Sequence, residues 1–76
     1  QLYPNPFADQ LQLNLPATFI LPGSVRIMNA TGQLIFQTTI TSTQQMLQLN
    51  ALASGMYLME VIDERGQISV IKAEKE

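Results

Sequence analysis

The chain of 76 residues contains neither cysteine nor histidine. Without cysteine, no disulfide bond and no thiolate metal site can form. Without histidine, the commonest general base and the commonest metal ligand are absent, and no Ser–His or Cys–His arrangement is available for nucleophilic catalysis. We therefore expect the protein not to be an enzyme and to bind no cofactor.

Charged residues are also scarce, at 13% of the chain, compared with about a quarter in typical domains. Lysine and arginine together number only 4 and the net charge is −2, whereas binding of nucleic-acid phosphates requires clustered basic residues. We expect neither a nucleic-acid partner nor a small-molecule ligand. No apolar run approaches the roughly 18 residues of a membrane-spanning helix, so none is predicted.

The polar part of the sequence consists mainly of Gln, Asn, Thr and Ser, and 46% of the residues are hydrophobic. This composition favours strands over helices. Turn-forming residues recur at short, even intervals between short apolar or alternating segments, which is typical of a sandwich or barrel. The sequence therefore predicts one domain with an all-β fold, an immunoglobulin-like antiparallel β-sandwich of about seven strands.

The clearest predicted strand covers residues 9–16, where Leu11, Leu13 and Leu15 alternate with polar residues, as in a strand with one buried face. The other predicted strands cover residues 18–21, 24–29, 33–40, 44–50, 55–63 and 67–75. Alternation also predicts that Leu47 and Leu49 point inward and that Val25 and Ile27 share the face opposite Arg26. In the 55–63 strand, Tyr57, Met59 and Val61 share one face, and Leu58, Glu60 and Ile62 share the other. The buried face of the 33–40 strand stays open, because Leu34, Ile35 and Phe36 are all apolar.

Two of the predicted turns contain a glycine that is expected to adopt positive φ. In NATG, residues 29–32, Asn29 can bond to its own backbone and Gly32 completes the turn. In DERG, residues 63–66, Gly66 occupies the hairpin position where positive φ costs least.

Acidic residues are the remaining candidates for chemistry. Asp63 and Glu64 are adjacent, and with Arg65 beside them we interpret them as a solvated turn rather than a catalytic pair. Ca²⁺ binds carboxylate and carbonyl oxygens, which Asp9, Asn5 or the Asp63 turn could supply. No D-x-D-x-D-G loop supports such a site, so no metal is predicted.

The segment LASGMY, residues 52–57, is typical of the corner where a chain crosses between the sheets of a sandwich. Tyr57 is expected to pack its ring under the corner and to donate its hydroxyl to a backbone group a few residues upstream. Gly55 lets the backbone bend without a Cβ clash, and Leu52 seals the corner from the core side. This structural interpretation requires no catalysis.

Four short segments follow one another along the chain: YPNP at residues 3–6, NATG at 29–32, LASGMY at 52–57 and KAEK at 72–75. In this order and spacing, with the last segment at the chain end, they closely resemble the C-terminal sorting domains of type IX secretion (Por secretion) cargo proteins of Bacteroidota. The resemblance covers essentially the whole chain. The matching residues are Pro4, Asn5, Pro6, Gly32, Leu52, Gly55, Tyr57, Lys72 and Lys75, and Asn29 stands where the family usually has Asp.

The resemblance implies a secretion signal without catalytic activity. Domains of this family direct a cargo from the periplasm across the outer membrane through the type IX translocon. A sortase-like peptidase then removes the domain, and the cargo is attached to the cell surface or released. The implied partners are the translocon, the peptidase and a cargo domain upstream in the same chain. Because the chain begins QLYPNP without an initiator Met, we expect it to be the C-terminal piece of a longer protein.

The resemblance also implies roles for particular residues. Translocon recognition is expected to involve Gly55, Tyr57, Lys72, Lys75 and Glu76. The structural turns and the corner are expected to involve Asn5, Pro6, Gly32, Leu52 and Gly66. Residues 1–8 are expected to form the end of a linker near the cleavage region, and residues 9–76 the sorting domain itself.

The last predicted strand is expected to lie at a sheet edge, where its unpaired N–H and C=O groups can accept a strand from a partner. Lys72 and Lys75 are interpreted either as ordinary edge charges that prevent wrong pairing or as contacts to an acidic surface. The family usually has apolar residues between these lysines. Here Ala73 and Glu74 occupy the positions, so we expect a weaker or frayed strand tip.

The alternative function is a fibronectin-like or immunoglobulin-like accessory module of a secreted enzyme, acting as a spacer or a weak carbohydrate binder. A carbohydrate binder requires an exposed aromatic platform, and aromatic residues make up only 7% of the chain. An enzyme is rejected because His, Cys and a convincing carboxylate pair are all missing.

Overall fold

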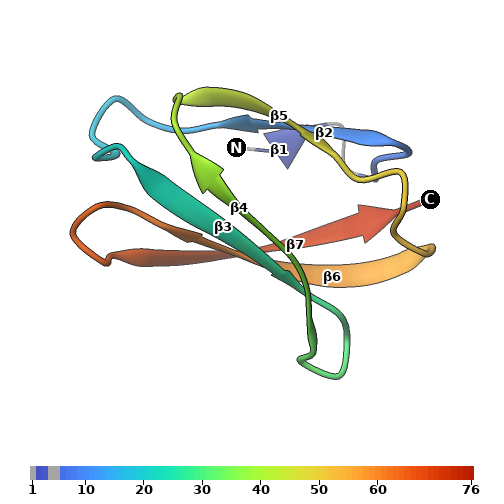
Figure 1. Ribbon diagram of the computed structural model, residues 1–76. Coiled ribbons are helices and arrows are strands. Elements are labelled where there is room, and N and C mark those ends of the chain that lie inside the picture. Colours follow the sequence, from blue (N-terminus) through green and yellow to red (C-terminus); the bar gives the residue numbers. More distant parts are fainter. Residues whose placement is uncertain (1, 4–5) are drawn as a thin grey trace.

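A computed structural model of the chain describes residues 2–3 and 6–76, with side chains from residue 6 onward. Within this part of the chain there is no helix, and the strands form two antiparallel sheets that lie as two layers (Figure 1). One sheet has the order β1-β2-β5 and consists of β1 (Leu2–Tyr3), β2 (Gln10–Asn14) and β5 (Gln44–Gln48). The other has the order β4-β3-β6-β7 and consists of β4 (Leu34–Ile40), β3 (Gly23–Met28), β6 (Gly55–Ile62) and β7 (Ile68–Lys75). The predicted all-β antiparallel fold in two sheets is confirmed.

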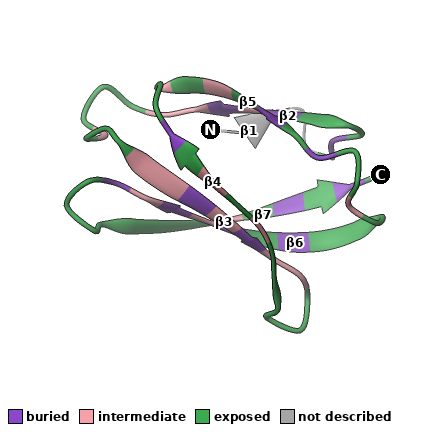
Figure 2. Cartoon of the chain, viewed as in Figure 1, coloured by how far each residue is buried: buried purple, intermediate pink, exposed green. Residues whose placement is uncertain are grey.

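The core lies between the two layers because the strands bury alternate side chains (Figure 2). Leu11 and Leu13 of β2 have no exposed surface, and Leu11 pairs with Leu47 of β5 across the smaller sheet. Leu15, which lies beyond the end of β2, is only partly buried and packs against the core. The buried hydrophobic residues are Phe7, Leu11, Leu13, Val25, Ile27, Ile40, Leu47, Leu49, Tyr57, Met59, Val61 and Ala73. This set confirms that Leu47 and Leu49 point inward, and it shows that the buried faces of β3 and β6 are those of Val25 and Tyr57.

The strand predicted at residues 18–21 is wrong. This segment is a loop that begins with a turn, in which Phe19 N–H donates to the Pro16 carbonyl at 3.0 Å. Phe19 packs against the core, whereas Ile20 and Leu21 are exposed. Pro16 and Pro22 explain the difference, because a segment of only five residues between two prolines has little room for ladder pairing.

The buried face of β4, which the sequence left open, is the face that carries Phe36 and Ile40. Leu34 and Ile35 are exposed instead. The pairing with β3 explains this result: Phe36 pairs with Ile27 and Leu34 with Met28, so the register shifts by one residue at Ile35. A bulge of this kind interrupts the alternation of buried and exposed side chains along β4. The run of three apolar residues therefore could not show which face is buried.

The two hairpins of the larger sheet are closed by turns of the same construction. In the β3–β4 turn, Asn29 Oδ1 accepts from the N–H groups of Thr31 at 3.1 Å and Gln33 at 2.9 Å. The predicted positive φ is found in both turns, at 87° for Gly32 and 83° for Gly66. Both hairpin turns are therefore stabilised by an acidic or amide side chain followed three residues later by glycine.

In the β6–β7 turn, Asp63 takes the place of the asparagine. Its Oδ1 accepts from the N–H groups of Arg65 and Gln67, each at 2.9 Å. Asp63 is not solvated as predicted, because it is only 7% exposed. The carboxylate is buried without a penalty for missing hydrogen bonds, since two backbone donors replace water.

Candidate recognition site at the C-terminal end

Most of the residues singled out from the sequence gather at one end of the sandwich. The start of β6 and the end of β7 meet there, since Gly55 pairs with Lys75. Phe7 lies beside the end of β7 and forms an isolated parallel bridge with Lys75. Figure 1 shows the chain terminus next to the connection between β5 and β6. We call residues 6–9, 52–57 and 74–76 the terminal cluster.

Phe7 fastens the end of β7 from its open side. Phe7 N–H donates to the Glu74 carbonyl at 2.8 Å, and Glu76 N–H donates to the Phe7 carbonyl at 2.8 Å. The side chain of Phe7 is 1% exposed and belongs to the core. Phe7 therefore contributes to the core although it lies in the segment expected to end a linker. The tip of β7 is not frayed as expected, because pairing with Phe7 compensates for the missing apolar residues.

Lys75 is buried in the terminal cluster, at 8% exposure. Its Nζ donates a hydrogen bond to the Ala8 carbonyl, lies 4.0 Å from Asp9 Oδ1 and lies 5.9 Å from the centre of the Phe7 ring. The interpretation of Lys75 as an exposed edge charge or as a contact to an acidic surface is therefore wrong. It points inward because odd-numbered residues of β7 face the core, as the burial of Ala73 also shows.

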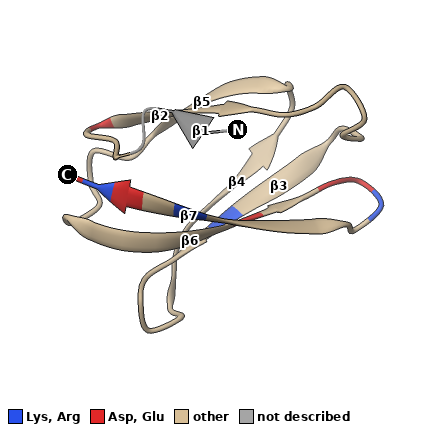
Figure 3. Cartoon of the chain, turned by 180° about the vertical axis from the view of Figure 1, so that it is seen from behind, with Lys and Arg blue, Asp and Glu red and all other residues tan. Residues whose placement is uncertain are grey.

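Lys72 and Glu76 are the exposed charged residues of the predicted recognition set. Lys72 stands on the outer face of the larger sheet and pairs with Leu58 of β6. Figure 3 shows that charges of alternating sign follow one another toward the end of β7, with few charges on the rest of the sheet. This end of β7 is therefore where a partner could contact charged groups of the predicted set.

The predicted tyrosine corner is confirmed. The Tyr57 hydroxyl donates to the Ala53 carbonyl four residues upstream, and the Tyr57 ring is buried. Gly55 has a φ of 144°, which strongly favours glycine, and Leu52 packs against the edge of the core. Since Tyr57 is only 7% exposed, it shapes this end of the domain and offers little surface to a partner.

Ser54 makes a contact that was not predicted from the sequence. Its hydroxyl donates to the Glu76 carbonyl at 2.9 Å, so the corner and the chain end hold each other. Ser54 and Phe7 share one difficulty for sequence analysis: each is a single residue outside a periodic run, where alternation gives no information.

The remaining predicted residues lie elsewhere or outside the described part. Pro6 is exposed and directly precedes Phe7. Gly32 and Gly66 lie in the two hairpin turns, away from the terminal cluster. Asn5 lies outside the described residues. Among residues 2–3 and 6–76, no three acidic side chains come together as a possible metal site, and no helix is long and apolar enough to cross a membrane.

Comparisons with known proteins agree with the resemblance seen in the sequence. A family model described as a secretion system C-terminal sorting domain matches residues 1–73. Among solved structures, the chain is similar to PorZ of Porphyromonas gingivalis, described as an essential bacterial surface component of the type IX secretion system. The identity is 28% and the TM-score 0.71, and the match covers 100% of this chain but 11% of that chain. No curated protein matches.

Proposed function

Because the chain belongs to the family of type IX secretion C-terminal sorting domains, we propose that it carries an N-terminally attached cargo through the periplasm and across the outer membrane. A sorting signal of this system implies export to the cell surface or secretion. The family match over residues 1–73 is the observation that carries the proposal. The chain acts as a substrate of the export machinery and not as an enzyme.

The terminal cluster is the surface that we assign to translocon recognition. It unites the opening, central and final segments of the family pattern, which lie far apart in the sequence. Glu76 is exposed for direct contact, as is Lys72 farther along β7, whereas Tyr57 and Lys75 hold the surrounding backbone in place. The translocon therefore reads a folded surface made from both ends of the domain, and not a flexible tail.

Removal by a sortase-like peptidase fits a cut upstream of Pro6. Phe7 is a core residue, so a cut after it would separate part of the core from the domain. A cut before Pro6 would remove β1 but leave the described contacts of Phe7, Ala8 and Lys75 in the terminal cluster intact. Cleavage near the start of this chain would therefore release a folded domain.

The sheet order supports an immunoglobulin-like classification. A three-stranded and a four-stranded antiparallel sheet pack face to face, and a tyrosine corner lies at the start of β6, the second-last strand of the chain. The carbohydrate-binding alternative finds no support in the described surface, because none of its exposed large hydrophobic residues is aromatic. Sorting is thus the function that the fold and its surface favour.

A reporter fusion tests the proposed function. The 76 residues fused to a periplasmic reporter are expected to bring it to the surface of a host with a type IX system. Lys72→Ala combined with Glu76→Ala should retain the reporter in the periplasm, because both changes remove exposed charges without touching the core. Met46→Ala, an exposed change on the smaller sheet, is the matched control. A wild-type fusion that stays in the periplasm would contradict the sorting function.

A further inference from the structure

The first half of β7 is an edge that lacks the usual protection. β7 is the last strand of its sheet, and residues 67–71, with the sequence QISVI, contain no charge and no proline. Ile68 and Val70 are 56% and 59% exposed. Natural edge strands are normally protected by charges, prolines or bulges. An uncharged edge of this length is therefore suited to pairing with another strand.

The pairing of Phe7 shows which backbone groups of β7 point to the open side. The Glu74 carbonyl and the Glu76 N–H face Phe7 and not β6. Because backbone direction alternates along a strand and the β6–β7 register has no shift, the groups of Ile68 and Val70 face the same side. Within residues 2–3 and 6–76, the structure gives these groups no partner on that side.

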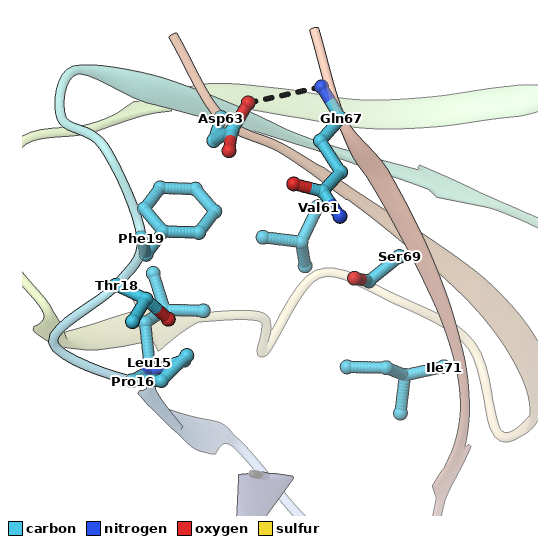
Figure 4. Close-up of a pocket in the computed structure, with 9 residues that line it drawn as sticks. All are labelled: Leu15, Pro16, Thr18, Phe19, Val61, Asp63, Gln67, Ser69 and Ile71. Carbon is cyan, nitrogen blue, oxygen red and sulfur yellow. Dashed lines mark hydrogen bonds between the residues drawn. The ribbon is translucent and has the colours of Figure 1, made fainter. Parts of the chain in front are cut away.

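A groove between the two layers borders this part of the edge (Figure 4). Ser69 and Ile71 point into it from β7, and Leu15 and Phe19 face them from the loop that follows β2. Its volume is about 220 Å³, below the roughly 300 Å³ at which small-molecule pockets begin. Its size suits one or two side chains.

The walls of the groove favour an apolar side chain. Asp63 is the charged residue of the lining, and its Oδ1 already accepts from two backbone N–H groups. Among the described residues, no buried side-chain nitrogen or oxygen lacks a hydrogen-bond partner. Leu15, Phe19, Val61 and Ile71 give the groove apolar walls, against which a large apolar side chain would be buried.

Phe7 shows how this edge receives an extended segment. It pairs with β7 through its backbone and places its ring between the two layers. We propose that Ile68–Ile71 and the adjoining groove accept one extended strand of a partner protein, which pairs with Ile68 and Val70 and inserts a large apolar side chain into the groove. The inference rests on the proposed function only for the source of the strand, a component of the secretion apparatus.

A tethered donor strand tests the proposal in the full chain. The donor Thr-Val-Thr-Phe-Thr-Val-Thr is joined to Glu76 by a Gly/Ser linker of about 20 residues, whose length of about 25 Å spans β7. Tethering supplies an effective concentration in the millimolar range. The amide protons of Ile68 and Val70, followed by NMR, should exchange at least about tenfold more slowly than in the chain without donor.

Two matched controls separate the backbone and the side-chain contributions. A donor with Phe replaced by Ser should give little protection. Val70→Pro should weaken donor binding, because it removes an N–H on the open side without breaking the ladder with β6, and Val70→Thr should not. Equal exchange at Ile68 and Val70 with the Phe and Ser donors, or protection on other strands only, would overturn the proposal. These exchange outcomes do not depend on whether the reporter fusion is exported. Failure of the strand-pairing inference can therefore be distinguished from failure of the proposed sorting function.

Discussion

The ammonium group of Lys75 donates a hydrogen bond to the backbone carbonyl of Ala8. Residues 67 positions apart in the chain are thereby joined, and the last strand is fastened to the segment that enters the domain. The backbone bonds between Phe7 and residues 74 and 76 run alongside this contact. The entry and the end of the domain thus form one structural unit.

Replacing Lys75 by methionine should destabilise the domain. Lys75→Met keeps the apolar stem but removes the bond to Ala8 and the contact with the Phe7 ring. We expect a loss of about 1–2 kcal/mol in the free energy of unfolding, measured by urea denaturation. Lys72→Met, at an exposed position of the same strand, should change it by less than about 0.5 kcal/mol. Equal effects of the two changes would show that the buried ammonium has no special role.

A chain that starts at Asp9 should fail to fold. It lacks Phe7, a core residue with 1% exposure, and truncation of such a side chain costs about 3–5 kcal/mol. A domain of this size has only about 3–5 kcal/mol of stability in total. Circular dichroism should show a cooperative thermal transition for the chain from Gln1 and none for the chain from Asp9. A cooperative transition in the shorter chain would instead support residue 9 as the domain boundary.

The Tyr57 hydroxyl should contribute measurably to the free energy of unfolding, although Tyr57 has little exposed surface. Tyr57→Phe leaves the ring in place and removes the donor to the Ala53 carbonyl. We expect a loss of about 1 kcal/mol, measured as the shift of the urea midpoint at unchanged slope. Met56→Leu, next to it on the exposed face, is the control. An unchanged midpoint would mean that water replaces Tyr57 at the corner.

The strands and the corner could be predicted because they depend on local pattern. Alternation identified the buried face of β2, and the spacing of Leu52, Gly55 and Tyr57 identified the corner. Each of these features is set by residues within a few positions of one another. The hairpin turns could be predicted for the same reason, because the positive φ of Gly32 and Gly66 is a property of the local backbone.

The composition of the terminal cluster could not be predicted, because it depends on which distant segments meet. Lys75 is a typical exposed residue by type, and only its place opposite Ala8 and Asp9 makes its burial favourable. Phe7 follows two prolines in a segment without periodicity, so nothing local marks it as core. The strand predicted at residues 18–21 was wrong for a related reason. Its apolar residues have a strand-like pattern, but within the described chain no neighbouring strand pairs with them.

The two hairpin turns provide a direct comparison of one hydrogen-bond arrangement at two levels of burial. Asp63→Ala should cost about 2–3 kcal/mol, because it removes a buried, charged acceptor that bonds the N–H groups of Arg65 and Gln67. Asn29→Ala should cost only about 1 kcal/mol, because water can reach the exposed turn and replace the lost acceptor. Asp63→Asn and Asn29→Asp keep the accepting oxygen and serve as controls, each with a change below about 1 kcal/mol. Urea denaturation of the four variants measures the differences. Equal losses for the two alanine variants would mean that burial of Asp63 does not raise the cost, and that the turn geometry alone determines it.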